Sequence, residues 1–142
     1  MSNIRIGLLV DVFLVLGAIF ALWKGGRAER AAAVVVLANV AVARIFGWMS
    51  PEISPLIWLC NDGVAALALL FITINFAAPW MGGVMLFFAA QFALHSYYLV
   101  NQRPFDFTTA LVNNLNWTGI TWCLIIGASL AWRRRLRARA AA

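Results

Sequence analysis

Long apolar segments occupy almost the whole chain, and only short polar or helix-breaking joints separate them. The segments lie at residues 6–23, 31–48, 56–76, 80–100 and 111–132. A helix needs about 20 largely apolar residues to cross the hydrocarbon core of a bilayer, so each segment is long enough for one crossing. The chain is 64% hydrophobic and 11% charged, far from the composition of a soluble globular protein. We therefore predict an all-α integral membrane protein, a compact bundle of about five transmembrane helices within residues 1–132.

The joints carry residues that interrupt helices. They include Lys24-Gly25-Gly26-Arg27, Ser50-Pro51-Glu52 and Asn101-Gln102-Arg103-Pro104. Residues 56–100 form one apolar stretch that is too long for a single crossing, and Pro79 is the natural place to break it. Two spans are therefore expected there.

Basic residues are concentrated beside the ends of the apolar segments. The chain has 11 Lys and Arg against 5 Asp and Glu, an excess that in a soluble protein would suggest nucleic acid. Here topology is the expected reason, and no nucleic acid partner is predicted. Cytoplasmic flanks are enriched in Lys and Arg, so the first joint and the arginine-rich residues 133–142 should both be cytoplasmic.

This placement requires an even number of crossings between the two basic clusters, and the second to fifth segments supply four. The orientation is then N-out/C-in, with residues 133–142 as a basic cytoplasmic tail that attracts anionic lipid. A cleaved signal peptide is the other interpretation of segment 6–23, but its basic residues follow the apolar run and Asp11 interrupts it. The abundance of Arg and Ala is typical of bacterial coding, and we expect the bacterial inner membrane.

Polar and charged side chains recur at one level of the predicted bundle, near the outer end of every span. Such groups are costly in a membrane and usually face a bundle interior or a wet cavity. Alternating the direction of the spans brings them to a common depth. The predicted ligand-binding residues are Asp11, Arg44, Asn61, Asp62, Gln91, His95, Tyr98, Asn113 and Asn116.

Helical spacing places some of these residues on shared faces. Gln91, His95 and Tyr98 follow the spacing i, i+4, i+7, and Asn113 and Asn116 share a face of the last span. Each face is a candidate wall of a pocket. The Asn side chains have a second interpretation, as hydrogen-bonding contacts between helices.

The joint before the last span combines a charge pair with two aromatic residues, Arg103-Pro104-Phe105-Asp106-Phe107. It is expected to act either as a lid over the polar cluster or as an anchor at the membrane interface.

Two residues of the cluster allow several chemical roles. Arg44 is expected to form an ion pair with Asp11 or Asp62, or to bind an anion such as a lipid phosphate or a substrate carboxylate. His95 is the only histidine, which excludes bis-His haem ligation and a three-His zinc site within one chain. A hydrogen-bonded histidine, a proton-linked function and a mixed site with Asp11 and Asp62 stay open. No cofactor is identified, and no metal is predicted.

The favoured function is binding or transport of a small polar, ionic or lipid-headgroup ligand, or a role as a subunit of a larger membrane assembly. Besides the lipid bilayer, a second copy or another membrane subunit is left open as a partner. One alternative is an outer-leaflet enzyme acting on a lipid-linked substrate, with His95 or an Asp as general base and Arg44 binding phosphate. Another is a holin-like pore former. The sequence contains no phosphate-binding loop, no His-Glu-x-x-His motif and no Gly-x-Ser-x-Gly motif.

Overall fold

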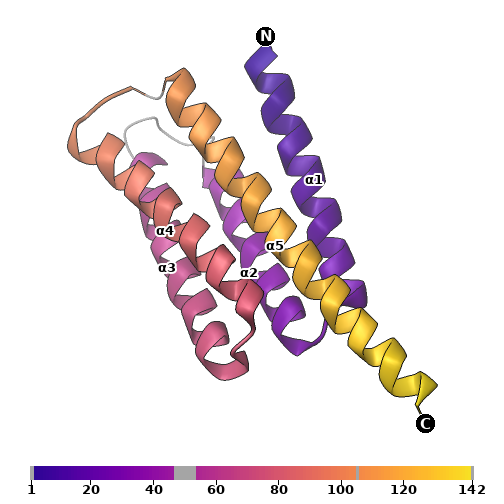
Figure 1. The fold of residues 1–142 in the computed structure, drawn as a ribbon. Helices are drawn as coiled ribbons and strands as arrows, with labels where there is room; N and C mark the ends of the chain where they lie inside the picture. The colour runs from indigo at the N-terminus through magenta and orange to yellow at the C-terminus, as the bar shows by residue number, and fades with distance from the viewer. Residues whose placement is uncertain (1, 47–53, 105, 142) are drawn as a thin grey trace.

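The computed structural model describes residues 2–46, 54–104 and 106–141 of the chain. Within these residues the chain forms five α-helices and no strand (Figure 1): α1 (Ser2–Lys24), α2 (Arg27–Phe46), α3 (Ser54–Phe76), α4 (Pro79–Val100) and α5 (Phe107–Ala140). The predicted all-α class is confirmed for this part of the chain. The predicted joint Ser50-Pro51-Glu52 and the last two residues of predicted segment 31–48 lie outside the described residues.

The break between α3 and α4 falls directly before Pro79. Between α3 and α4, Ala77 has a φ of 46°, in the left-handed region, and Pro79 is the first residue of α4. Proline suits that position because its fixed φ is helical and its missing N–H would have no partner there. The break predicted at Pro79 is therefore confirmed.

Helix α5 is longer than the predicted segment 111–132 at both ends. It begins at Phe107 behind a capping residue, and it continues through the arginine-rich residues to Ala140. Ala and Arg favour helix, and basic residues near a helix C-terminus interact favourably with its dipole. Arg135 donates a hydrogen bond to the backbone carbonyl oxygen of Lys24, so the two basic clusters lie at the same end of the molecule.

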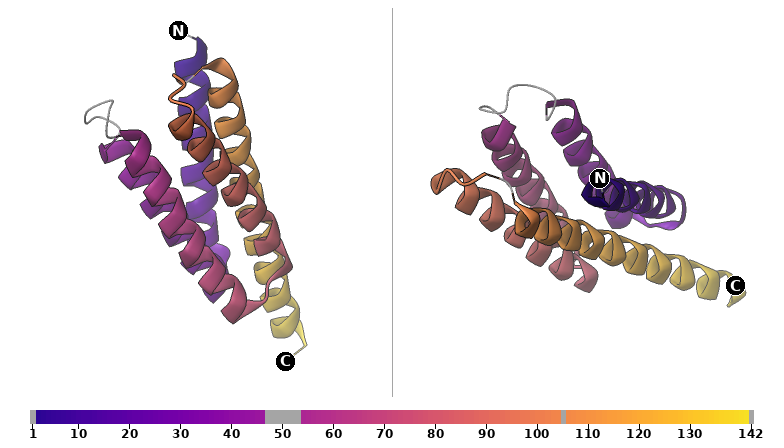
Figure 2. Two further views of the ribbon diagram at one scale, coloured as in Figure 1. Left: turned by 90° about the vertical axis from the view of Figure 1, so that its left-hand side faces the viewer. Right: turned by 90° about the horizontal axis from the view of Figure 1, so that it is seen from above.

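The helices form a closed ring in which each helix packs against its neighbours in the sequence. Helix α5 completes the ring by packing against α1, and it also touches α2. Figure 2 shows α2 and α3 leaning away from α1, α4 and α5 toward the end where the N-terminus lies. We call this end, which holds the start of α5, the open end. The closed end is the opposite one, which holds the turns at Gly25-Gly26 and Ala77-Ala78.

The core is apolar toward the closed end and is built from every described helix. Its buried members are Leu14, Ala32, Val36, Ala65, Leu69, Ile72, Met81, Val84, Phe88, Ile120 and Leu124. Glycines let α4 and α5 approach closely, because a Cβ atom at Gly127 would lie 2.6 Å from ring atoms of Trp80, and one at Gly83 would lie 2.7 Å from Cys123 Sγ. Small residues at these positions therefore set the spacing of the two helices.

A buried carboxylate fastens the closed end. Glu29 Oε2 accepts a 2.9 Å hydrogen bond from the backbone N–H of Gly26, and Glu29 Oε1 accepts one of 3.1 Å from Trp80 Nε1. Both oxygens are satisfied, as a buried carboxylate requires. Glu29 thus joins the turn between α1 and α2 to the first turn of α4.

Most of the outer surface is apolar. Large hydrophobic side chains such as Leu9, Leu67, Phe71 and Leu86 are exposed on the described helices, which suits contact with lipid rather than water. Of these helices, four are long and apolar enough to cross a membrane: α1, α3, α4 and α5. Helix α2 carries Arg27, Glu29, Arg30 and Arg44 and falls short of that apolarity, so the fifth crossing stays a prediction.

The close approach at Gly127 gives a prediction with a matched control. Gly127→Ala should lower the free energy of unfolding by about 1–3 kcal/mol, because the new methyl group must displace the Trp80 ring. Gly82→Ala in α4 should cause no loss, because a Cβ atom there meets nothing within 4 Å. Thermal unfolding in detergent, followed by far-ultraviolet circular dichroism, measures both. Equal melting temperatures for the two variants would contradict this packing.

Candidate functional site

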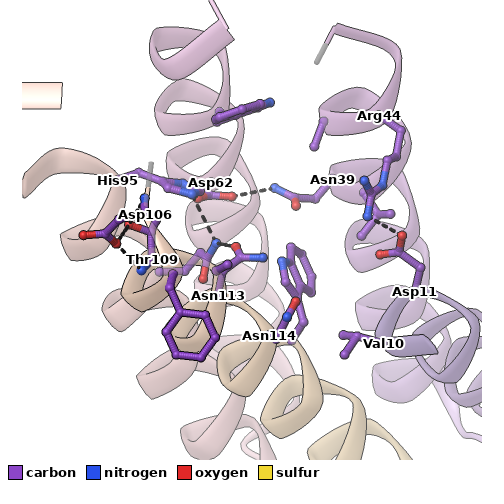
Figure 3. A pocket seen from close by; sticks show the side chains of 17 residues that line it. Val10, Asp11, Asn39, Arg44, Asp62, His95, Asp106, Thr109, Asn113 and Asn114 are labelled. Carbon is purple, nitrogen blue, oxygen red and sulfur yellow. Dashed lines mark hydrogen bonds and ion pairs between the residues drawn. The ribbon is translucent and has the colours of Figure 1, made fainter. Parts of the chain in front are cut away.

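A cavity of about 600 Å³ lies at the open end, within the size range of pockets that hold small molecules. We call it the chamber. Residues from each of α1 to α5 line it, and Figure 3 shows Asp62 and His95 on one side, Arg44 and Asp11 on the other, and Asn39 between them. The lining residues are Val10, Asp11, Asn39, Val40, Ala43, Arg44, Trp58, Asp62, Gln91, His95, Asp106, Phe107, Thr109, Ala110, Asn113, Asn114 and Trp117.

The Asp62 side chain, only 4% exposed, is the central acceptor of the chamber wall. Asp62 Oδ1 accepts a 3.2 Å hydrogen bond from Asn39 Nδ2 of α2, and Asp62 Oδ2 lies 2.6 Å from His95 Nδ1 of α4. The carboxylate therefore joins α3 to both neighbouring helices. An ionised carboxylate accepts hydrogen bonds and cannot donate them, so His95 Nδ1 carries the hydrogen of that contact.

The other nitrogen of His95 continues the network into α5. His95 Nε2 lies 3.3 Å from Gln91 Nε2, which also donates to Asn113 Oδ1. Gln91 Oε1 accepts a 3.0 Å hydrogen bond from Asn116 Nδ2. With His95 neutral and protonated on Nδ1, Nε2 is an acceptor and every one of these contacts pairs a donor with an acceptor.

Asn39 is satisfied at its nitrogen and unsatisfied at its oxygen. The residue is buried, with only 3% of its surface exposed. Among the described residues, Asn39 Oδ1 is the buried side-chain polar atom with no hydrogen-bond partner. The amide cannot be turned to improve this, because its oxygen would then face the Asp62 carboxylate. Asn61 Nδ2 supports the same helix by donating a 2.8 Å hydrogen bond to the backbone carbonyl oxygen of Asn39.

An ion pair forms the rim of the chamber between α1 and α2. Arg44 donates to Asp11 Oδ2, and the two side chains are 62% and 30% exposed. This contact is the pairing that the sequence analysis allowed for Arg44. Because the pair is exposed, its contribution to stability is small compared with a buried pair.

The start of α5 is fixed by Asp106. Asp106 Oδ1 accepts hydrogen bonds from the backbone N–H of Thr109 at 2.8 Å, from Thr109 Oγ1 at 2.9 Å and from Tyr98 Oη at 2.9 Å. These contacts stabilise the ionised form, so they lower the pKa of the Asp106 carboxyl below its ordinary value of 3.8. Tyr98 thereby ties the end of α4 to the beginning of α5.

Aromatic rings complete the wall. The Trp58 ring lies 6.2 Å from the His95 ring, measured between centroids, and the Trp117 ring lies 5.9 Å from that of Phe88 in an edge-to-face arrangement. The chamber consequently combines polar groups with indole surfaces.

The structure brings the predicted site residues together at one end. Asp11, Arg44, Asp62, Gln91, His95 and Asn113 line the chamber, while Asn61, Tyr98 and Asn116 stand one hydrogen bond behind it. That they bind a ligand stays a prediction. Within the described residues, no group of three or more His, Cys, Asp or Glu side chains is placed to share a metal ion.

The predicted ligand-binding set leaves out several polar or aromatic lining residues, namely Asn39, Trp58, Asp106, Thr109, Asn114 and Trp117. Of these, Asp106 belongs to the joint expected to be a lid or an anchor. Two of them carried a readable signal. Asn39 is an amide within an apolar segment, where such side chains usually face the interior of a bundle. Asp106 and Thr109 have the spacing of a helix N-cap and its third residue.

Comparison of the chain with protein-family models, with curated proteins and with solved structures gave no match.

The buried and exposed contacts of the chamber should differ in a double-mutant cycle. Replacing Asp62 and His95 by Ala, singly and together, should give a coupling energy of about 0.5–3 kcal/mol, because each single variant leaves a buried partner unsatisfied. The matched cycle at Asp11 and Arg44 should give about 0.2–1 kcal/mol. Unfolding in detergent measures both, and a larger coupling at the rim would refute the assignment of Asp62 as the central acceptor.

The cap at Asp106 should be needed only for the first turn of α5. Asp106→Ala should speed amide hydrogen exchange at Thr109 and Ala110, whereas Asp106→Asn should preserve protection, because Asn also caps helices well. In the unsubstituted protein, the pKa of Asp106 is lowered, so the stabilisation by the charged cap is fully present above the ordinary pKa of 3.8. That stabilisation is lost as the pH falls through the lower pKa of the folded state. Exchange measured by mass spectrometry tests the variants, and equal rates in Ala and Asn variants would argue against capping.

Proposed function

We propose that this protein crosses the bacterial cytoplasmic membrane five times, N-out/C-in, and binds a small polar ligand in the chamber from the outer side. The observation that carries the proposal is the chamber: a cavity of about 600 Å³ whose polar lining comes from every described helix at one level. If these polar side chains served only to hold the helices together, they would be expected to pack without a large cavity, because protein interiors are close-packed.

Helix α2 is the fifth crossing in this proposal. It packs between α1 and α3 in the ring and has 20 residues, a length of about 30 Å. Its charges lie at its two ends, with Arg27, Glu29 and Arg30 at the closed end and Arg44 at the open end. The uncharged middle of α2 thus lies at the depth of the hydrocarbon.

The distribution of basic residues supports the orientation. The closed end holds Lys24, Arg27, Arg30 and the five arginines of residues 133–139. Because cytoplasmic flanks are rich in Lys and Arg, the closed end is assigned to the cytoplasm and the chamber to the outer leaflet.

One contact favours an enzymatic alternative. The Asp62–His95 hydrogen bond is the arrangement that orients a histidine as a general base. The catalytic nitrogen would be His95 Nε2, which Gln91 already contacts. Catalysis would need that contact to open, whereas ligand binding needs no change in the network, so binding is our conclusion.

Cysteine accessibility tests the proposal directly. In a variant lacking Cys60 and Cys123, Ala43→Cys and Ala110→Cys should react with a membrane-impermeant maleimide added outside intact cells, because both positions line the chamber. Val64→Cys is the matched control. It lies on α3 close in sequence to Asp62, yet its side chain is exposed on the outer surface, where lipid would shield it.

Ala138→Cys, on the closed-end extension of α5, should react only after the cells are permeabilised. Failure of positions 43 and 110 to react would overturn the outer chamber. Reaction of position 138 in intact cells would overturn the orientation.

A further inference from the structure

The chamber is acidic overall. Among the described lining residues, the carboxylates of Asp11, Asp62 and Asp106 outnumber the single guanidinium of Arg44. That guanidinium is already paired with Asp11. Three carboxylates against one guanidinium leave the net charge of the chamber negative, even if His95 adds one positive charge. A negative charge in a cavity with low-dielectric walls attracts cations and repels anions.

A residue of the chamber wall, Asn39, also carries a buried acceptor without a donor. Asn39 Oδ1 is held away from Asp62 by the requirement that the amide nitrogen face the carboxylate. A buried acceptor without a donor costs free energy. Asn39 is a residue of the chamber wall, so an N–H group of a ligand that reaches this buried oxygen would remove that cost.

Indole rings add a third feature that selects for cations. Trp58 and Trp117 both line the chamber, and the face of an indole ring attracts a cation more strongly than that of Phe or Tyr. A protonated amine is the chemical group that fits all three features. It carries a positive charge for the acidic groups and the indole rings, and it has N–H donors for the unsatisfied acceptor.

We propose that the chamber binds a primary ammonium group, with the positive charge balanced by Asp62 and Asp106 and one N–H directed to Asn39 Oδ1. The group belongs either to a free amine or to the headgroup of an aminophospholipid. This inference rests on the proposed function, since it names the ligand class of the same chamber.

A labelling protection experiment tests the ligand class. The Ala43→Cys variant, without Cys60 and Cys123, is purified in detergent and reacted with an uncharged maleimide in the presence of benzylammonium, benzyltrimethylammonium or benzoate. These probes share a phenyl ring and differ in charge and in N–H groups. Benzylammonium should protect at about tenfold lower concentration than benzyltrimethylammonium, which lacks an N–H donor, and benzoate should not protect.

Two variants connect protection to the named residues. Asn39→Leu should weaken protection by benzylammonium about tenfold, while Asn75→Leu, an exposed Asn→Leu change in α3, should leave it unchanged. Should Asn39→Leu fail to fold, Asp106→Asn serves instead. It keeps an N-cap residue and removes one negative charge, so protection by benzylammonium should weaken severalfold.

Lipid vesicles separate the two sources of the ammonium group. Slower labelling in phosphatidylethanolamine–phosphatidylglycerol vesicles than in phosphatidylcholine–phosphatidylglycerol vesicles, with no added amine, identifies a lipid headgroup. Equal labelling in the two vesicles, with protection by benzylammonium, identifies a free amine.

Protection by benzoate equal to that by benzylammonium would overturn the ligand class, and so would equal protection by the two cations. If position 43 reacts readily and no probe protects it, the ammonium proposal fails while the accessible chamber stands. If position 43 does not react at all, the chamber proposal itself fails.

Discussion

The buried carboxylate of Asp62 is the constraint on which the open end of the bundle depends. A carboxylate surrounded by apolar helices is tolerated only when both oxygens are hydrogen-bonded. Asn39 on α2 and His95 on α4 supply those bonds. His95 must then present its second nitrogen to Gln91, whose amide is shared with Asn113 and Asn116 of α5. One acidic side chain therefore fixes the relative positions of α2 to α5 at the level of the chamber.

The helices are held together by different contacts at the two ends of the bundle. At the closed end, small residues allow close approach, as where Gly127 receives the Trp80 ring. The buried Glu29 carboxylate there accepts hydrogen bonds from Gly26 and Trp80. At the open end, polar side chains bridge helices that stand further apart, because α2 and α3 together lean away from α1, α4 and α5 (Figure 2). Hydrogen bonds across such a separation can hold the helices without filling the space between them. The chamber is the volume left by that arrangement.

The helices and most of the polar cluster could be predicted from the sequence. The length of an apolar segment and the distance of a residue from its end can both be read directly along the chain. The break at Pro79 and the meeting of Asp62, His95 and Gln91 follow from them. The sequence could not predict the role of a side chain where that role depends on a residue that is close only in the folded structure. Glu29 reads as one charge among basic residues, and only the proximity of Trp80 makes it a buried acceptor. Asn39 reads as a mid-depth amide, and its unsatisfied oxygen follows from the position of Asp62.

The apolar core favours binding of a ligand in the chamber over its passage through the bundle. Beneath the polar level, Leu69, Phe88 and Leu124 belong to one buried apolar cluster that continues toward the closed end. Such packing offers a polar ligand no partners, and moving a cation through it would incur the full cost of desolvation. In this arrangement, a ligand that enters the chamber leaves by the same end. Transport would require α2 and α3 to rotate as a pair relative to α1, α4 and α5. The two groups of helices would then come together at the open end and separate at the closed end. The contacts of Glu29 with Gly26 and Trp80 are the ones that such a movement would have to break first.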